Sequence, residues 1–262
     1  MSGVPQIARI LRLELSVADV ARSVAFYRDG LGFEVLAVGD AMVRLGLGGR
    51  ELGLRQVEGG QLGPAPAQAN APAFQHFAVV VRDMAAAYAH VAPLAGAPFS
   101  RGGPQHLPPR NGGVRAWKFR DPDGRPVELL ELRTGAWREA ADAAPQRLFL
   151  GIDHTALACA NLEASLAFYT ARGFHQGEAS HNYGPAQDAL DGLDGVDLRI
   201  ATLHTPEPGP HIELLHYRTP PPPARTPADG DDRFVTTALE ASTGAAAPER
   251  DPDGHRLAIV GW

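Results

Sequence analysis

The sequence predicts an α+β protein built from tandem βαβββ modules, three of them complete and the fourth degenerate. Two internal repeats support this prediction, because a repeated motif marks a repeated structural unit. The Ser-x-Ala-Phe-Tyr motif occurs at Ser23–Tyr27 and returns at Ser165–Tyr169. The tetrapeptide Asp-Pro-Asp-Gly occurs at Asp121–Gly124 and returns at Asp251–Gly254. Strand-like and helix-like segments alternate around these motifs in the order that the modules require.

The repeats divide the chain into two similar halves, which meet near Ala141–Arg147. We expect one domain at residues 1–140, containing modules one and two. We expect a second at residues 148–262, containing module three and a truncated module four. The chain has 262 residues, 44% of them hydrophobic, which is enough for at least one sizeable core, and the length allows one large or two ordinary domains.

Each complete module is expected to begin with a strand that is followed directly by a helix. The strands are apolar, β-branched runs at Leu11–Val17, Phe74–Val81 and Gly151–Cys159. An Ala-rich segment with helical spacing follows each strand, after an Asp or Asn that fits an N-cap. The helices are predicted at Val20–Asp29 after Asp19, at Met84–Ala92 after Asp83, and at Leu162–Arg172 after Asn161.

Short strands complete each module, as at Val35–Ala37, Met42–Leu47 and Leu52–Gln56 in module one. The Asp-Pro-Asp-Gly tetrapeptides fit tight turns before a last strand, because Pro presets φ and Gly supplies a positive φ. We expect a structural role for these turns rather than a chemical one.

The fourth module is expected to be eroded. Arg233–Leu239 fits its first strand and His255–Val260 its last, whereas Glu240–Arg250 is too short for a full helix. Pro220–Arg225 is rich in proline and predicts a stiff connector between modules three and four.

Two positions distinguish modules two and three from the others. At one position of the first strand, the modules carry Arg12, His76, His154 and roughly Arg233. At one position of the last strand, they carry Gly53, Glu128, Glu213 and Ala258. A carboxylate on an apolar strand face is costly to bury unless it is paired or binds a metal. A buried His–Glu pair in each module would satisfy this condition, but the same pair at equivalent places in two modules favours one shared site.

Two imidazoles and two carboxylates suit one divalent ion, Zn²⁺, Ni²⁺, Co²⁺, Mn²⁺ or Fe²⁺. Such a set leaves one or two coordination positions for water or substrate, as a catalytic site requires. We therefore expect one divalent metal ion as the cofactor.

These features together resemble the vicinal oxygen chelate superfamily, which includes glyoxalase I, bleomycin resistance proteins, methylmalonyl-CoA epimerase, extradiol dioxygenases and fosfomycin-resistance enzymes. The resemblance extends over residues 8–218 and, more weakly, 230–262. It implies that pairs of modules form curved mixed sheets with outer helices, and that the metal lies inside the cup. The ligands that it implies are His76, Glu128, His154 and Glu213.

The resemblance implies a metal-dependent enzyme that chelates a small substrate through vicinal oxygens. Glu128 or Glu213 would act as general base in a glyoxalase-type lyase reaction or an isomerisation. A second hypothesis is an extradiol ring-cleaving dioxygenase with Fe²⁺ on His76, His154 and one glutamate. A third is a non-catalytic protein that binds a small molecule.

Further polar residues are candidates for substrate binding. His106 and Arg110 lie in a loop rich in turn formers, and Asn182, Tyr183 and Gln187 follow the third predicted helix. His211 shares a strand face with Glu213, so we expect it to help orient a ligand. We expect surface positions for the remaining histidines considered, His90, His175, His204 and His255.

Composition limits the partners. Lys and Arg number 24 against 30 Asp and Glu, a net charge of −6, which argues against nucleic acid or an anionic membrane surface. No apolar run is long enough for a membrane helix, and no secretory signal is recognised, so we expect a cytoplasmic protein. The single Cys159 excludes an intrachain disulfide and is expected to pack as a small apolar residue. An eroded fourth module would leave a sheet edge that a second copy could cover, in a homodimer.

Overall fold

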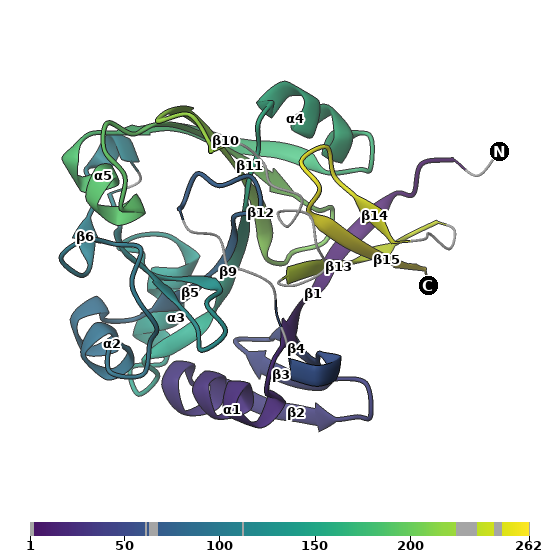
Figure 1. The fold of residues 1–262 in the computed structure, drawn as a ribbon, viewed down its shortest axis with the longest axis horizontal. Helices are drawn as coiled ribbons and strands as arrows, with labels where there is room; N and C mark the ends of the chain where they lie inside the picture. The colour runs from purple at the N-terminus through teal and green to yellow at the C-terminus, as the bar shows by residue number, and fades with distance from the viewer. Residues whose placement is uncertain are drawn as a thin grey trace.

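The computed structural model describes residues 3–60, 62, 68–111, 113–223, 235–243 and 248–261. Two mixed sheets form its framework (Figure 1). The seven-stranded sheet has the order β14 (Glu249–Arg250), β15 (Arg256–Gly261), β13 (Val235–Ala241), β1 (Ile7–Val17), β4 (Arg50–Gln56), β3 (Val43–Leu47) and β2 (Glu34–Val38). The eight-stranded sheet has the order β10 (His175–Tyr183), β11 (Asp197–His204), β12 (His211–Thr219), β9 (Phe149–Ala158), β5 (Gln75–Val81), β8 (Pro126–Glu131), β7 (Arg115–Arg120) and β6 (Gln105–His106).

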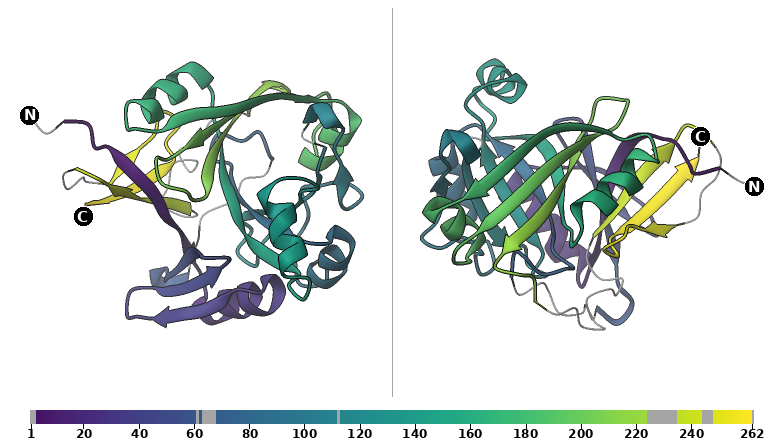
Figure 2. Two further views of the ribbon diagram at one scale, coloured as in Figure 1. Left: turned by 180° about the vertical axis from the view of Figure 1, so that it is seen from behind. Right: turned by 90° about the horizontal axis from the view of Figure 1, so that it is seen from above.

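The helices lie outside the curved sheets (Figure 2), as expected for the predicted fold class. Their bounds are Val20–Ala25 for α1, which continues as a π-helical turn at Phe26–Gly30, Met84–Val91 for α2, Ala136–Ala143 for α3, Leu162–Thr170 for α4 and Pro185–Asp191 for α5. None of the helices in the described ranges is long and apolar enough to cross a membrane.

The predicted modules are confirmed. Modules one, two and three read β1-α1-β2-β3-β4, β5-α2-β6-β7-β8 and β9-α4-β10-β11-β12. The three predicted N-caps form, since Asp19 accepts a hydrogen bond from the backbone of Arg22, and Asp83 and Asn161 do the same for their helices. The helices α3 and α5 were not predicted.

The fourth module keeps strands only in the part of the chain that the structure describes. It contributes β13, β14 and β15. The predicted strand at 233–239 begins at Val235 in the described residues, and Arg233 lies outside them. The end of the predicted connector, residues 224–225, also lies outside the described residues.

The sheets join the modules across the two halves of the chain. In the seven-stranded sheet, β1 of module one pairs antiparallel with β13 of module four. In the eight-stranded sheet, β5 of module two pairs antiparallel with β9 of module three. Each sheet therefore takes one module from each half, and the division into domains at 1–140 and 148–262 stays a prediction.

Hydrophobic packing also joins modules within a half. One core combines residues of modules one and two, such as Leu15 and Leu52 with Phe77 and Val127. Another combines modules three and four, with Leu214 and Leu239 among its members. The two cores and the two sheets thus tie all four modules together.

The two sequence repeats contact each other in both halves. Tyr27, in the first Ser-x-Ala-Phe-Tyr motif, donates a hydrogen bond of 2.6 Å to the buried carboxylate of Asp121. Tyr169, in the second, donates one of 3.1 Å to Asp251. The repeated motifs therefore join the helix of one module to the turn of the next, the structural role expected of the turns.

One histidine expected at the surface is buried. The His255 ring donates a hydrogen bond of 2.8 Å to the carbonyl oxygen of Ala158, and its side chain lies under the end of β9. The prediction for His255 was wrong because the turn that precedes it folds back against module three.

Candidate metal centre

The four predicted ligands come from four adjacent strands at the middle of the eight-stranded sheet. His76 lies on β5, Glu128 on β8, His154 on β9 and Glu213 on β12. In the parallel pairs, Ala78 lies opposite Glu128, and Ala156 lies opposite Glu213. Each His is therefore two residues before the partner of its Glu, and alternation puts both side chains of a pair on one face.

Three of these side chains meet closely. His76 Nε2 lies 3.0 Å from Glu128 Oε2 and 3.4 Å from His154 Nε2. His154 Nε2 lies 3.6 Å from Glu128 Oε2 and 3.6 Å from Glu213 Oε2. His154 is thus the common neighbour of the other three.

These separations match those of ligands around one ion. Ligand atoms about 2.1 Å from a metal lie about 3.0 Å apart in octahedral geometry and about 3.4 Å apart in tetrahedral geometry. The distances among His76, Glu128 and His154 run from 3.0 to 3.6 Å, and Glu213 lies 3.6 Å from His154 but outside the group of three whose ligand atoms are all within 4.8 Å of one another. The spacing of His76, Glu128 and His154 therefore fits a divalent transition-metal ion, with Glu213 next to His154 as the fourth candidate.

The centre is buried on one side and open on the other. The side chains of His76 and His154 are 2% and 3% exposed, whereas that of Glu213 is 23% exposed. His76 Nδ1 is buried and has no hydrogen-bond partner among the described residues. A small molecule would reach the centre from the side of Glu213.

Charge compensation controls the protonation of the carboxylates. Burial raises the pKa of Glu128, but the nearby Lys118 and His76 outweigh it and hold that pKa well below the usual range. Burial acts in the same direction on Glu213, and His154 is the main group that lowers its pKa. Both glutamates are therefore held as anions, the form that binds a metal.

The two imidazoles differ. Burial lowers the pKa of His76, and Glu128 offsets this only in part. Burial also acts to lower the pKa of His154, but Glu213 and Asp153 raise it well above its usual value. An ion at the centre would displace the proton that these carboxylates otherwise favour on His154.

A β-bulge supplies a partner that the sequence analysis missed. The register passes from Ala78 opposite His154 to Val79 opposite Ile152, which leaves Asp153 as an extra residue in β9. The bulge allows Asp153 Oδ2 to accept a hydrogen bond of 2.8 Å from His154 Nδ1.

This contact orients His154. Because Nδ1 carries the donated proton, the lone pair of Nε2 is directed toward the other ligands. Trp137 of α3 donates to the second oxygen of Asp153. His211 lies 3.9 Å from Asp153 Oδ2 and 3.8 Å from Glu213 Oε1, next to both but beyond hydrogen-bond distance.

A buried polar network continues from Glu128. Lys118 lies directly opposite Glu128 in the β7–β8 pair, and its Nζ lies 2.7 Å from Asp191 Oδ1. Gln187 donates a hydrogen bond of 2.8 Å to the other oxygen of Asp191. Asn182 donates one of 3.2 Å to Gln187.

Two candidates for substrate binding are therefore internal. Asn182 and Gln187 are buried, and they connect through Asp191 to Lys118. Lys118 and Asp191 could not be predicted from the sequence, because a single lysine on an apolar strand gives no sign of what faces it.

The other candidates are more exposed. The Arg110 guanidinium stacks over the Tyr183 ring, 4.7 Å from its centre. Asn111 holds this segment by donating a hydrogen bond of 3.2 Å to the carbonyl oxygen of Tyr183. His106 is exposed on β6. The structure thus brings Arg110 and Tyr183 together at the surface.

The equivalent positions of the seven-stranded sheet carry a different set. Gly53 lies opposite Glu14, and Ala258 lies opposite Ala238. Counting back two residues gives Arg12 and Thr236 at the His positions. The alignment of Arg233 with His76 was therefore wrong by three residues. Arg12 is paired with Glu14 at 2.6 Å.

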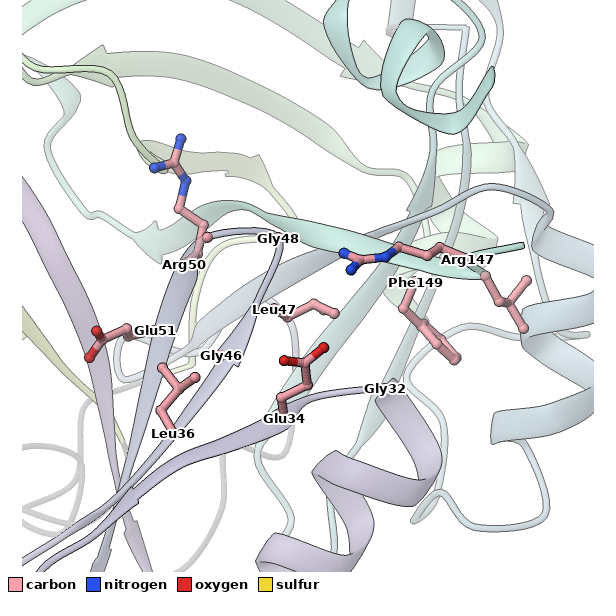
Figure 3. Close-up of a pocket in the computed structure, with 12 residues that line it drawn as sticks. Gly32, Glu34, Leu36, Gly46, Leu47, Gly48, Arg50, Glu51, Arg147 and Phe149 are labelled. Atoms are coloured by element: carbon pink, nitrogen blue, oxygen red, sulfur yellow. The ribbon is translucent and has the colours of Figure 1, made fainter. Parts of the chain in front are cut away.

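A separate pocket of about 530 Å³ lies where the β3–β4 turn meets the start of β9 (Figure 3). Glu34, Glu51, Arg50 and Arg147 contribute its charged groups. None of the four ligand residues lines it, so it is distinct from the candidate metal centre.

Comparison with known proteins gives consistent results. The model of the glyoxalase/bleomycin resistance protein/dioxygenase superfamily matches residues 9–129 and 151–247. Glyoxalase I from Zea mays superposes with a TM-score of 0.67 at 17% identity, covering 97% of this chain and 92% of that one. A "putative dioxygenase" from Bacillus subtilis superposes with a TM-score of 0.60 at 14% identity, covering 98% and 86%. The comparison with curated proteins finds no match. At these identities the two structures establish the fold only.

Proposed function

Since this chain belongs to the glyoxalase/bleomycin resistance protein/dioxygenase superfamily, we propose that it is a metal-dependent enzyme of glyoxalase or epimerase type. It binds a small molecule through two neighbouring oxygens and moves a proton on it. The observation that supports this most is the meeting of His76, Glu128 and His154 within 3.0–3.6 Å, with Glu213 at the open side.

The four residues would hold one divalent ion, Zn²⁺, Ni²⁺, Co²⁺, Mn²⁺ or Fe²⁺. Bound there, such an ion would supply Lewis acidity for negative charge on a substrate oxygen. His76, His154 and Glu128 are the buried ligands. Asp153 orients His154, and Lys118 keeps Glu128 anionic.

Glu213 is the general base. It is the most exposed of the four, and its carboxylate is anionic, so it can take a proton from a substrate carbon at the open side of the cup. Glu128 is less suited to proton transfer, because Lys118 and His76 stabilise its charged form on the buried side.

Metal content and turnover of two variants test this division of roles. We expect Glu213→Gln to keep most of the metal and to lose turnover of the hemithioacetal formed from methylglyoxal and a thiol, or of a 2-substituted 3-oxo thioester. Glu128→Gln is expected to lose the metal itself. If both variants held metal and retained turnover, the proposed roles would be wrong.

A second candidate function rests on the smaller set of three. His76, Glu128 and His154 alone place their ligand atoms within 4.8 Å of one another, which suits Fe²⁺ in an extradiol dioxygenase. Iron in protein purified without added metal and coloured ring-fission products from catechols in air would favour it. A metal-free protein that binds a small molecule and is indifferent to chelators would instead be a binding protein.

The cytoplasmic location and the homodimer stay predictions. So do the substrate-binding roles of His106, Arg110, Asn182, Tyr183, Gln187 and His211.

A further inference from the structure

Four histidines form a continuous row across the concave face of the eight-stranded sheet. In the antiparallel pairs, His175 on β10 lies directly opposite His204 on β11. Leu203 lies opposite Ile212, so His204 on β11 faces His211 on β12 in the same register. His211 lies directly opposite His154 on β9. These four strands are neighbours in the sheet (Figure 1).

The rings of this histidine row (His175, His204, His211 and His154) contact one another in sequence. Their centres are separated by 5.7 Å between the first two, 5.1 Å between the second and third, and 5.2 Å between the third and fourth. At the end of the row, the ring centre of His154 lies 5.5 Å from that of His76. One imidazole per strand thus connects the sheet edge to the candidate metal centre.

Exposure falls along the row. His175 is exposed on the edge strand β10, and His204 is partly buried. The side chain of His211 is 17% exposed and that of His154 is 3% exposed. The row therefore begins where an ion in solution can reach it and ends at a buried ligand.

The backbone of β10 approaches the His204 ring closely. Gly177 on β10 faces it, and a Cβ at this position would lie 2.6 Å from His204 Nε2. A residue with any side chain would press on that nitrogen, so glycine at position 177 keeps His204 Nε2 free of contact with a side chain from this position.

The row has the chemistry of a metal-binding surface. Imidazole nitrogen is a preferred ligand of Zn²⁺, Ni²⁺ and Co²⁺. Side chains directly opposite on neighbouring strands have Cβ atoms about 5 Å apart, so two such rings can share one ion. The net charge of −6 also favours the approach of a cation.

We propose that His175 and His204 form a second, weaker site for a divalent transition-metal ion, and that His211 passes the ion from it to the buried centre. The inference rests on the proposed metal centre, because the row ends at one of its ligands. It assigns a function to His175 and His204, which the sequence analysis interpreted as surface residues without a role.

Zn²⁺ titration of the metal-free full-length protein tests the second site. We expect the wild type to bind two equivalents, one tight and one weaker. The variant His175→Ala/His204→Ala should lose the weaker equivalent, and His154→Ala should lose the tight one and keep the weaker. A control variant, His90→Ala/His181→Ala, removes two histidines outside the row and should bind as the wild type does.

The rate of loading tests the route. When Zn²⁺ is limiting, the double variant should fill the tight site about tenfold more slowly than the wild type, because the ion is no longer concentrated at the entrance. The final content of the tight site should be the same. In the wild type, NMR signals of the His175 and His204 rings should shift with the second equivalent.

The outcomes separate the two proposals. If the wild type binds no metal at all, both the proposed function and the second metal site are contradicted. If the wild type binds one tight equivalent and the double variant matches its stoichiometry and loading rate, the second site is contradicted and the proposed function stands. Circular dichroism of all three variants checks that they are folded.

Discussion

At the scale of single residues, the orientation of His154 depends on a neighbour in its own strand. Asp153 can reach His154 Nδ1 only because the β-bulge turns it to the same side of β9. The other ring nitrogen of His154, Nε2, is thereby left to bind the metal. A partner of this kind contributes to affinity without touching the ion.

Replacing Asp153 should therefore weaken metal binding and leave the fold intact. We expect Asp153→Asn to lower the affinity for Zn²⁺ about 10- to 100-fold, as measured by competition with a chromophoric chelator. Asp142→Asn is the matched control, since Asp142 is an exposed partner of Arg138 in α3. Equal affinities in wild type and Asp153→Asn would show that the hydrogen bond does not orient the ligand.

The single cysteine should be unreactive in the folded protein. Burial raises the pKa of Cys159 from its usual 9.0 to about 12, so the thiol stays protonated at pH 8. A thiol reagent should label the chain only after denaturation.

The same shift predicts a pH effect on stability. In the unfolded chain the thiol ionises above about pH 9, whereas in the folded chain it stays neutral until about pH 12. The contribution of Cys159 to the free energy of unfolding is therefore complete below pH 9 and is lost as the pH rises toward 12. Cys159→Ala should show a smaller loss of stability over this range in urea unfolding.

At the scale of elements, the same contact between helix and turn occurs twice with different partners. Asp121 accepts from Tyr27 and pairs at 2.6 Å with the fully buried Arg125. At the equivalent place in the second half, Asp251 accepts from Tyr169, and His255 stands where the arginine would be.

The two copies should therefore respond differently to the same substitution. Asp121→Ala leaves the Arg125 charge buried without this carboxylate, and we expect a loss of about 3–5 kcal/mol in the free energy of unfolding. Asp251→Ala leaves hydrogen bonds unmade but leaves no buried arginine without its carboxylate. We therefore expect a smaller loss, about 1–3 kcal/mol in the free energy of unfolding. Urea unfolding measures both. Equal losses would mean that the buried ion pair adds nothing beyond the hydrogen bonds.

Elements with a strong local pattern could be predicted from sequence. The first strands and the capped helices α1, α2 and α4 follow from apolar runs and from Asp19, Asp83 and Asn161. Helix α5 lacks such a pattern, because it begins after Gly184 without a side-chain cap and lies in a segment rich in polar residues. The bulge at Asp153 is set by pairing with β5, which no local pattern records.

At the scale of the whole molecule, the candidate ligands belong to different halves of the chain. His76 and Glu128 lie in module two, and His154 and Glu213 in module three. The choice of these four residues follows from comparing modules within one sequence. Their convergence depends on β5 pairing with β9, a long-range contact that the repeats suggest but do not determine.

An ion at this place should bind the two halves together. Since a ligand that binds only the folded state stabilises it by about 2.7 kcal/mol at 100 times its dissociation constant, we expect the melting temperature to rise with added Zn²⁺. Chelation should reverse the rise. At Zn²⁺ concentrations that fill only the tight site, His154→Ala should abolish the rise, whereas His90→Ala, outside the centre, should keep it. A melting temperature that responds equally in both variants would place the stabilising ion elsewhere.

The most direct measurement is anomalous diffraction from crystals grown with Zn²⁺ or Ni²⁺ and recorded at the absorption edge of the metal. The predicted result is a strong peak within bonding distance of His76, Glu128, His154 and Glu213. A full-occupancy ion bound elsewhere, with these side chains still hydrogen-bonded to one another, would contradict the assignment.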